Sequence, residues 1–196
     1  MISFNKKFIF IHIPKCGGTS MEKFILDNID SKAIETKHFT IDRYKSVYNN
    51  IGSYFKFCLI RDPYERFLSL YNYFCGGSEM WKNKSADSDV SIIDFALRLA
   101  EGKPFTSGRA WPAHYKTQYS FVNNDCDLIL KLEDINEGIE ALKREFNCPL
   151  ANFPQVNISK KKSPARFTRE VCEVINDIYD IDFKAFGYTK KIAWKT

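Results

Sequence analysis

Residues 8–29 join an apolar run to an amphipathic helix through two adjacent glycines, and this order constrains the fold more than any other stretch. Residues 8–13 read FIFIHI, which is apolar on both faces and typical of a central parallel strand. Residues 14–18 (PKCGG) form a turn, and residues 19–28 carry apolar side chains at helical spacing. A turn that opens a helix directs backbone N–H groups to one point, where the helix dipole adds positive potential. The segment therefore predicts an anion site at the end of the first strand.

The rest of the chain continues to alternate predicted strands with predicted helices. We expect strands over residues 33–36, 54–60 and 127–132. We expect helices near Thr40, from Pro63, over residues 91–100, from Asp134 with Glu137 in a capping box, and over residues 168–179 before a short tail. The pattern predicts an α/β fold, a parallel sheet flanked by helices. With 196 residues and no linker composition, we expect a single domain over residues 1–196.

Composition excludes some classes of protein. The net charge of +5 suits an anionic ligand or glycan but does not indicate nucleic acid. The apolar runs are too short to span a bilayer, and the six cysteines lack metal-site spacing. We expect a soluble, cytoplasmic chain with reduced thiols and no metal. The alternative is a lumenal domain cut from a membrane-anchored parent, and oligomeric state is not indicated.

The order of residues in the first loop sets it apart from the usual P-loop of triphosphatases. In that loop lysine follows the glycines and a hydroxyl binds magnesium. Here Lys15 stands two residues ahead of Gly17, and Thr19 and Ser20 supply hydroxyls after the glycines. We predict a P-loop-type sheet whose loop binds a nucleotide ester without metal. The alternative is a plain glycine turn with a surface lysine.

A second motif, FCLIRDPYERFLSLYNYF over residues 57–74, repeats the strand, charged end and helix. Arg61 stands at the carboxyl end of the strand, where open α/β sheets bind ligands. Ser69 lies about six residues into the helix, so both side chains can converge on one phosphate if the helix folds back beside the strand. Asp62 and Arg66 indicate local capping and ion pairing.

The two motifs together, IPKCGGTS and RDPYERFLSLY, resemble the cofactor motifs of sulfotransferases, especially carbohydrate enzymes of the heparan 2-O and chondroitin type. The resemblance implies 3'-phosphoadenosine 5'-phosphosulfate as donor, 3',5'-adenosine bisphosphate as product, and a carbohydrate or other hydroxyl acceptor. It also extends to HYKTQYSF and LKLEDINEGIEAL. Cys16 departs from the family, in which threonine is more usual. By resemblance, the phosphosulfate is bound by Lys15, Cys16, Gly17, Gly18, Thr19 and Ser20, and the 3'-phosphate by Arg61 and Ser69.

Sulfuryl transfer to a hydroxyl requires a general base within hydrogen-bond reach of that hydroxyl. Enzymes of the 2-O type place their catalytic histidine in the segment that corresponds to His38, which is our expected base. Lys15 is the other expected catalytic residue, because it can neutralise charge on the leaving oxygen. Glu35 is a reserve base, and His12 is expected to be a packed core histidine.

The acceptor side is indicated less strongly. His114 resembles a family histidine near the acceptor, although it can equally be a packed loop residue. Arg109 could line a sugar cleft with other basic and aromatic side chains, namely Lys103, Lys116, Trp81, Trp111 and Tyr115. The run Lys160, Lys161 and Lys162 is either a solvated loop or a contact to the cofactor or an acidic polysaccharide.

Two other functions stay open. A P-loop kinase for a small molecule or nucleoside would share the sheet and first loop, but it would need magnesium and leave Arg61 and Ser69 unexplained. A non-catalytic relative that binds nucleotide or glycan would keep both anion sites and lack a base.

Overall fold

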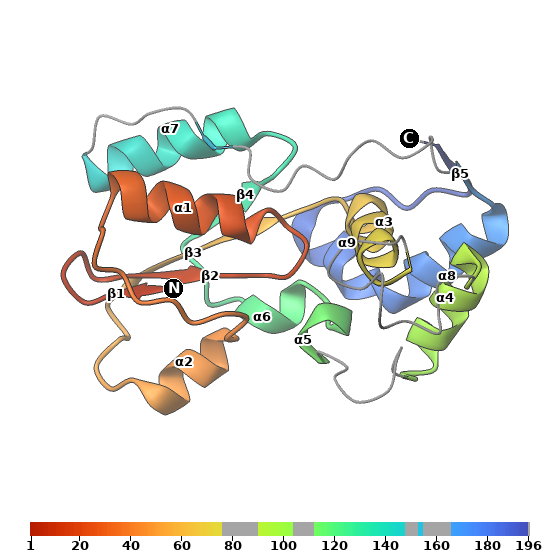
Figure 1. Ribbon diagram of the computed structural model, residues 1–196, viewed down its shortest axis with the longest axis horizontal. Helices are drawn as coiled ribbons and strands as arrows, with labels where there is room; N and C mark the ends of the chain where they lie inside the picture. The colour runs from red at the N-terminus through yellow and green to blue at the C-terminus, as the bar shows by residue number, and fades with distance from the viewer. Residues whose placement is uncertain (76–89, 104–111, 148–152, 155–165, 196) are drawn as a thin grey trace. The chain divides into compact units, whose positions relative to one another are not determined.

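A computed structural model describes residues 1–75, 90–103, 112–147, 153–154 and 166–195 of the chain (Figure 1). These residues belong to two compact units. The first unit is Met1–Arg61 with Gln118–Ile158, and the second is Asp62–Thr117 with Ser159–Thr196. The chain therefore leaves the first unit after Arg61 and returns to it at Gln118.

The first unit is built on a four-stranded sheet with the order β1-β2-β3-β4. Its strands are β1 (Ile2–Ser3), β2 (Phe8–Ile11), β3 (Phe55–Ile60) and β4 (Leu128–Lys131). β2, β3 and β4 are parallel, and β1 pairs antiparallel with β2. The α/β fold with a mostly parallel sheet is confirmed. Parallel strands end at one edge, so the residues after β2 and β3 are placed on the same side of the sheet.

Helices cover both faces of this sheet. α1 (Gly18–Asn28) and α7 (Ile135–Phe146) lie on one face, and α2 (Ile41–Val47) and α6 (Tyr119–Val122) lie on the other (Figure 1). Alternate strand residues such as Phe8, Phe10 and Phe57 pack against Phe24 of α1 and Leu142 of α7. Each such side chain contributes roughly 1.5–3 kcal/mol on burial, so this core fixes α1 against the sheet.

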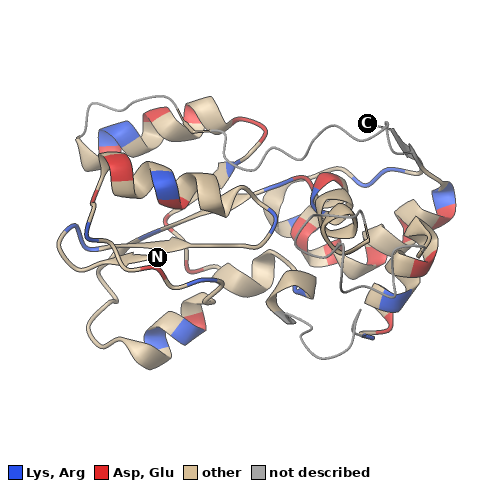
Figure 2. Cartoon of the chain, viewed as in Figure 1, with Lys and Arg blue, Asp and Glu red and all other residues tan. Residues whose placement is uncertain are grey.

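Charged residues on these helices are mixed in sign. Figure 2 shows acidic and basic positions together on each of α1, α2 and α7. On α1, Lys23 and Asp27 form an exposed ion pair one turn apart, with Nζ and Oδ2 2.8 Å apart. The helix surfaces thus present no single sign of charge. The side chains of these three helices therefore do not by themselves indicate where an anion binds.

Some predicted elements differ from the observed ones. Residues 33–36 do not form a strand: the segment makes only an antiparallel bridge from Ile34 to Ile2, because β1 occupies the place beside β2. The capping box at Asp134 is also wrong. Its side chain makes no capping hydrogen bond, and its carbonyl oxygen accepts from the N–H of Gly138 instead.

The second unit is mainly helical. It contains α3 (Pro63–Phe74), α4 (Ile92–Ala100), α5 (Pro112–Tyr115), α8 (Arg169–Ile178) and α9 (Asp180–Phe186), with β5 (Arg166–Phe167) antiparallel to β6 (Trp194–Lys195). Phe67 of α3, Phe95 of α4 and Ile175 of α8 share one core, and α3 confirms the helix that was predicted from Pro63. The predicted tail after Tyr179 is instead α9, whose Phe183 packs into the same core. No helix in the described part of the chain is long and apolar enough to cross a membrane.

Candidate functional site

The loop that joins β2 to α1 has the backbone expected of an anion site. Lys15 and Gly17 both adopt left-handed φ angles, 68° and 80°. Gly17 caps α1 without a side-chain hydrogen bond, and its carbonyl oxygen accepts from the N–H groups of Ser20 and Met21. The N–H groups of Gly18 and Thr19, in the first turn, have no partner inside the helix by geometry. A backbone that alternates between left-handed and right-handed conformations just before a helix forms a concave surface with positive potential.

The two glycines are needed for different reasons. Gly17 has a positive φ that glycine adopts without cost, and a Cβ atom there would approach Leu132 to 3.0 Å. Gly18 has no such angle, but a Cβ atom there would lie 2.2 Å from Nε2 of His12. The loop can thus pass the His12 ring only because residue 18 has no side chain.

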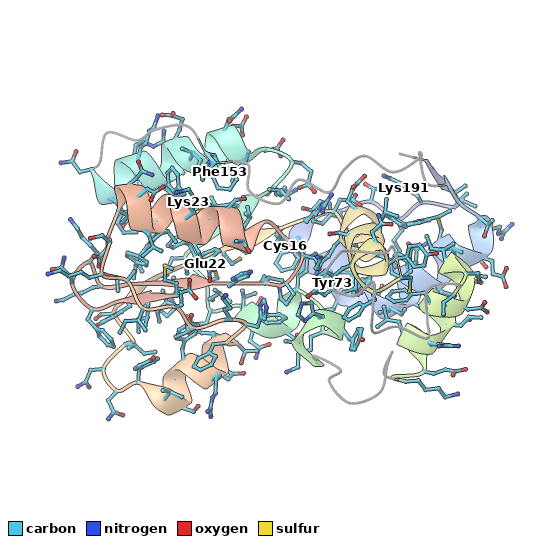
Figure 3. The ribbon with its side chains drawn as sticks, in the orientation of Figure 1. Cys16, Glu22, Lys23, Tyr73, Phe153 and Lys191 are labelled. Carbon is cyan, nitrogen blue, oxygen red and sulfur yellow. The ribbon has the colours of Figure 1, made fainter. Side chains whose placement is uncertain are left out.

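His12 is paired with a carboxylate inside the unit. Its Nδ1 lies 2.8 Å from Oε1 of Glu22, and both side chains are buried. Glu22 lies on the inner side of α1, next to the exposed Lys23 (Figure 3). Burial by itself raises the pKa of Glu22, but the hydrogen bond and charge of His12 outweigh burial and hold that pKa below its ordinary value. The prediction of His12 as a packed, hydrogen-bonded histidine agrees with this geometry.

His38, the expected base, lies against His12. The two ring centroids are 4.7 Å apart in an edge-to-face arrangement, and His38 Nδ1 is 3.3 Å from the carbonyl oxygen of His12. A carbonyl oxygen only accepts, so this contact places the proton on Nδ1 and leaves Nε2 as the basic nitrogen. Burial lowers the pKa of His38 to about 4, and the charge of His12 acts in the same direction. His38 is therefore neutral at neutral pH, as a base must be.

Gln118 connects the two sequence motifs within the first unit. Its Oε1 accepts from the backbone N–H of Arg61 at 2.9 Å and from the thiol of Cys16 at 3.1 Å. Its Nε2 donates to the carbonyl oxygen of Arg61 at 2.8 Å. Cys16 belongs to the glycine loop (Figure 3), so one buried carboxamide bonds both segments that were predicted to bind anions.

Two of the predicted site residues of the second unit, Ser69 and His114, lie among the described residues. Ser69 is half-buried on α3, and its convergence with Arg61 on one phosphate stays a prediction. His114 is buried, and its ring stacks on Tyr73 with centroids 5.8 Å apart. His114 is therefore packed, as one of its two interpretations predicted, but it lies in α5 and not in a loop. Its contact with an acceptor stays a prediction.

Two residues beside Arg61 act locally. Asp62 caps α3, because its Oδ1 accepts from the N–H groups of Tyr64 and Glu65, as predicted. Arg66 is buried and its Nη2 donates to the carbonyl oxygens of Lys116, at 2.9 Å, and His114, at 3.4 Å. The role of Arg66 in holding this turn was not predicted.

The sequence model of the sulfotransferase family matches residues 1–189. This chain belongs to the sulfotransferase family. Carbohydrate sulfotransferase 14 of Mus musculus is 25% identical over an alignment of 231 residues, which covers 96% of this chain. The chain spans 59% of the length of that relative. No solved structure matches the chain.

In this member of the sulfotransferase family, the first unit brings two further predicted residues, His38 and Arg61, into contact with residues that touch the glycine loop. His12 contacts both Gly18 and His38, and Gln118 bonds Cys16 and Arg61. The carboxylate of Glu35, the reserve base, faces Lys37 across 3.6 Å at the surface. Several acceptor-side predictions lie outside the described residues: Arg109, Trp81, Trp111, Lys160, Lys161 and Lys162. Within the part that is described, no three His, Cys, Asp or Glu side chains form a metal-binding group.

Two partners of the site in this sulfotransferase-family chain were missed from sequence. Glu22 carried a usable signal, because an acidic residue three before the buried Ile25 falls on the inner face of α1. Gln118 belongs to HYKTQYSF, a stretch noted for its family resemblance, but its partners Cys16 and Arg61 could not be named because they are far away in the sequence.

Proposed function

We propose that the chain transfers a sulfuryl group from 3'-phosphoadenosine 5'-phosphosulfate to a hydroxyl group of a carbohydrate. The observation that carries this proposal is the bonding of Cys16 and Arg61 to the same carboxamide of Gln118. It ties the glycine loop to a second basic element at one edge of the sheet, as a ligand with two separate anionic groups requires. The name of the carbohydrate sulfotransferase relative supports the acceptor class.

The residues of the first unit fit such a donor. The backbone around Gly17 and the start of α1 suit a phosphosulfate group, and Lys15 stands at the same turn. Arg61 would hold the 3'-phosphate, and the contribution of Ser69, a residue of the second unit, stays a prediction from the resemblance. When bound, the donor supplies a sulfur–oxygen bond whose bridging oxygen leaves with the adenosine bisphosphate.

His38 and Lys15 would divide the chemistry between them. Nε2 of His38 accepts the proton of the acceptor hydroxyl while that oxygen bonds to sulfur and the bond from sulfur to the bridging oxygen breaks. Lys15 neutralises the charge that develops on the bridging oxygen. An anion bound beside His38 raises the pKa of its imidazole from the low value of the free protein, which makes it a stronger base.

Transfer of labelled sulfate from the donor to a panel of glycans and small alcohols tests this proposal. We expect transfer to a glycan by the wild type, and loss of about 10²–10⁴-fold in turnover for His38→Asn, with 3',5'-adenosine bisphosphate still bound. Asparagine is the chosen replacement because His38 has a left-handed φ of 60°, which asparagine tolerates. Near-full turnover by His38→Asn would show that another residue is the base.

Thermal shift separates the proposed function from its alternatives. We expect 3',5'-adenosine bisphosphate to raise the melting temperature more than ATP with magnesium. The opposite order would favour a kinase. Stabilisation by the bisphosphate without transfer to any acceptor in the panel would favour a binding protein.

A further inference from the structure

At the end of β3, the side chain of Gln118 takes over the backbone hydrogen bonds that a neighbouring strand makes earlier in β3. The last backbone bond between β3 and the chain beyond β4 runs from the N–H of Leu132 to the carbonyl oxygen of Ile60. At the next residue, Arg61, both backbone groups bond instead to the Gln118 carboxamide, which offers one donor and one acceptor. One side chain thus bonds both backbone groups of Arg61.

Gln118 is itself held rigidly. It precedes α6, and its carbonyl oxygen accepts from the N–H of Phe121, a fully buried residue. Its own side chain is fully buried and makes no capping bond to α6, so its polar atoms serve Arg61 and Cys16. An unmet buried amide is costly, which gives the carboxamide a strong preference for this one arrangement.

The same oxygen that accepts from Arg61 also accepts from the thiol of Cys16. Cys16 follows Lys15 in the glycine loop and is fully buried. One carboxamide thus fixes how far the start of the arginine side chain lies from the loop. A ligand that bridges the loop and the guanidinium would need a distance between its two anionic groups that matches this separation.

We infer that Gln118 is a positioning residue that sets Arg61 for the 3'-phosphate and so gives the site its preference for 3'-phosphorylated adenosine. The inference rests on the proposed function. Gln118 need not touch the ligand. It acts on Arg61 through the backbone of that residue. Through Cys16 it also holds the glycine loop, which would bind the 5'-phosphosulfate.

The chemistry of other side chains explains why glutamine suits this place. Glutamate has two acceptors and no donor, so it would face the carbonyl oxygen of Arg61 with a second oxygen. Asparagine is one methylene shorter and cannot reach the same partners from the same backbone. Methionine fills a similar volume and forms none of the three bonds.

The test compares the dissociation constants of 3',5'-adenosine bisphosphate and 5'-AMP by calorimetry. Both ligands share the adenosine and the 5'-phosphate, so their ratio isolates the 3'-phosphate. Damage to the glycine loop alone weakens the binding of both ligands and leaves the ratio of their dissociation constants unchanged. We expect the wild type to prefer the bisphosphate, Arg61→Met to lose that preference, and Gln118→Met to lose about 10-fold or more of it, since small misplacements of a charged group have large effects.

Ser3→Ala is the control for general damage. It removes a buried hydrogen bond to Asp30 in the same unit, among residues with no part in the site. We expect it to reduce stability and to leave the ratio of dissociation constants at the wild-type value.

The outcomes separate the inference from the function beneath it. A Gln118→Met protein that keeps the wild-type ratio, when Arg61→Met has lost it, would overturn the inference and leave the proposed function intact. A wild type without preference would overturn both. If circular dichroism shows that Gln118→Met is unfolded, Gln118→Asn takes its place, and retention of the ratio by that variant counts equally against the inference.

Discussion

The imidazole ring of His12 lies so close to the α-carbon of Gly18 that a Cβ atom at residue 18 would stand 2.1 Å from the ring. The ring cannot easily move away, because its Nδ1 is bonded to the buried Glu22. The first residue of α1 is therefore glycine for a steric reason, and the neighbouring Gly17 for a conformational one. Replacing residue 18 disturbs the glycine loop and the histidine pair together.

We predict that Gly18→Ala destabilises the protein by about 1–3 kcal/mol, the usual range for overpacking a tight interior. It should also weaken binding of 3',5'-adenosine bisphosphate, since the loop has to shift. Urea unfolding measures the first effect and calorimetry the second. Gly52→Ala is the matched control, because a Cβ atom there meets nothing within 4 Å. Equal stability of the two variants would contradict the close approach of His12.

We predict that His12 and Glu22 stabilise the fold as a pair. In a double-mutant cycle with His12→Asn and Glu22→Gln, the coupling energy at pH 7 should fall in the range of about 0.5–3 kcal/mol that contacting residues show. Each single variant leaves a buried polar group with a poorer partner, so the double variant should lose less than the sum.

The pH dependence of this pair has a definite sign. The pKa of Glu22 in the folded chain lies below 4.5, so its contribution is present above pH 4.5 and is lost as the pH falls through the lowered value. Unfolding free energies of wild type and Glu22→Gln should converge in that acid range. Parallel curves from pH 7 down to pH 3 would rule out the coupling.

We predict that His38 destabilises the fold in mild acid. Its pKa is about 4 in the folded chain against 6.5 when unfolded, so between these values the unfolded chain binds a proton that the folded chain does not. Wild-type stability should therefore fall as the pH drops from 6.5 towards 4. In His38→Asn this part of the decline should be absent. Melting temperatures of both proteins across pH 4–7.5 provide the measurement, and identical profiles would contradict a neutral, buried His38.

We predict that Lys15→Asn lowers kcat by about 10²–10³-fold, as expected when a charge that stabilises the leaving oxygen is removed. Asparagine accepts the left-handed φ of residue 15, so the loop backbone is retained. Lys23→Gln, on the exposed side of α1, is the control for loss of one positive charge nearby. A similar kcat loss in both variants would indicate general electrostatics instead of a role for Lys15 in the reaction.

We predict that Arg66→Met destabilises the protein by about 1–3 kcal/mol, because the carbonyl oxygens of His114 and Lys116 lose a buried donor. Arg98→Met, at an exposed position of α4, should have a much smaller effect. Chemical unfolding compares the two. Similar losses would mean that the guanidinium of Arg66 does not hold this turn.

Strong hydrophobic patterns in the sequence predicted the core of the fold. β2, β3, α1 and α3 lie within a residue or two of their expected ranges, since each has an apolar face that decides its burial. Weak elements were missed. α9 was predicted as a tail because its seven residues are too few to show a clear helical period. The segment at Ile34 failed as a strand because β1 fills the neighbouring place.

The candidate site was predictable as far as local motifs reach. The glycine loop and Arg61 could be named from sequence, because a turn or a strand end indicates where such residues lie. His38 was named from the family resemblance, since the strand expected before it does not form. Glu22, Arg66 and Gln118 act through contacts that only the folded chain creates. A glutamine more than fifty residues from its partner carries no periodic or spacing signal.

The bonds between Arg61 and Gln118 close the base of a long excursion of the chain, which leaves the first unit after one of these residues and comes back at the other. Because both ends of the excursion are pinned at one point, its length matters little to the sheet: doubling a flexible loop costs only about 0.6 kcal/mol of closure entropy. Residues 62–117 share a core with the helices after residue 166, so the two segments form one exchangeable unit. Grafting both segments together from another sulfotransferase should yield chimeras that keep the sheet and the glycine loop unaltered.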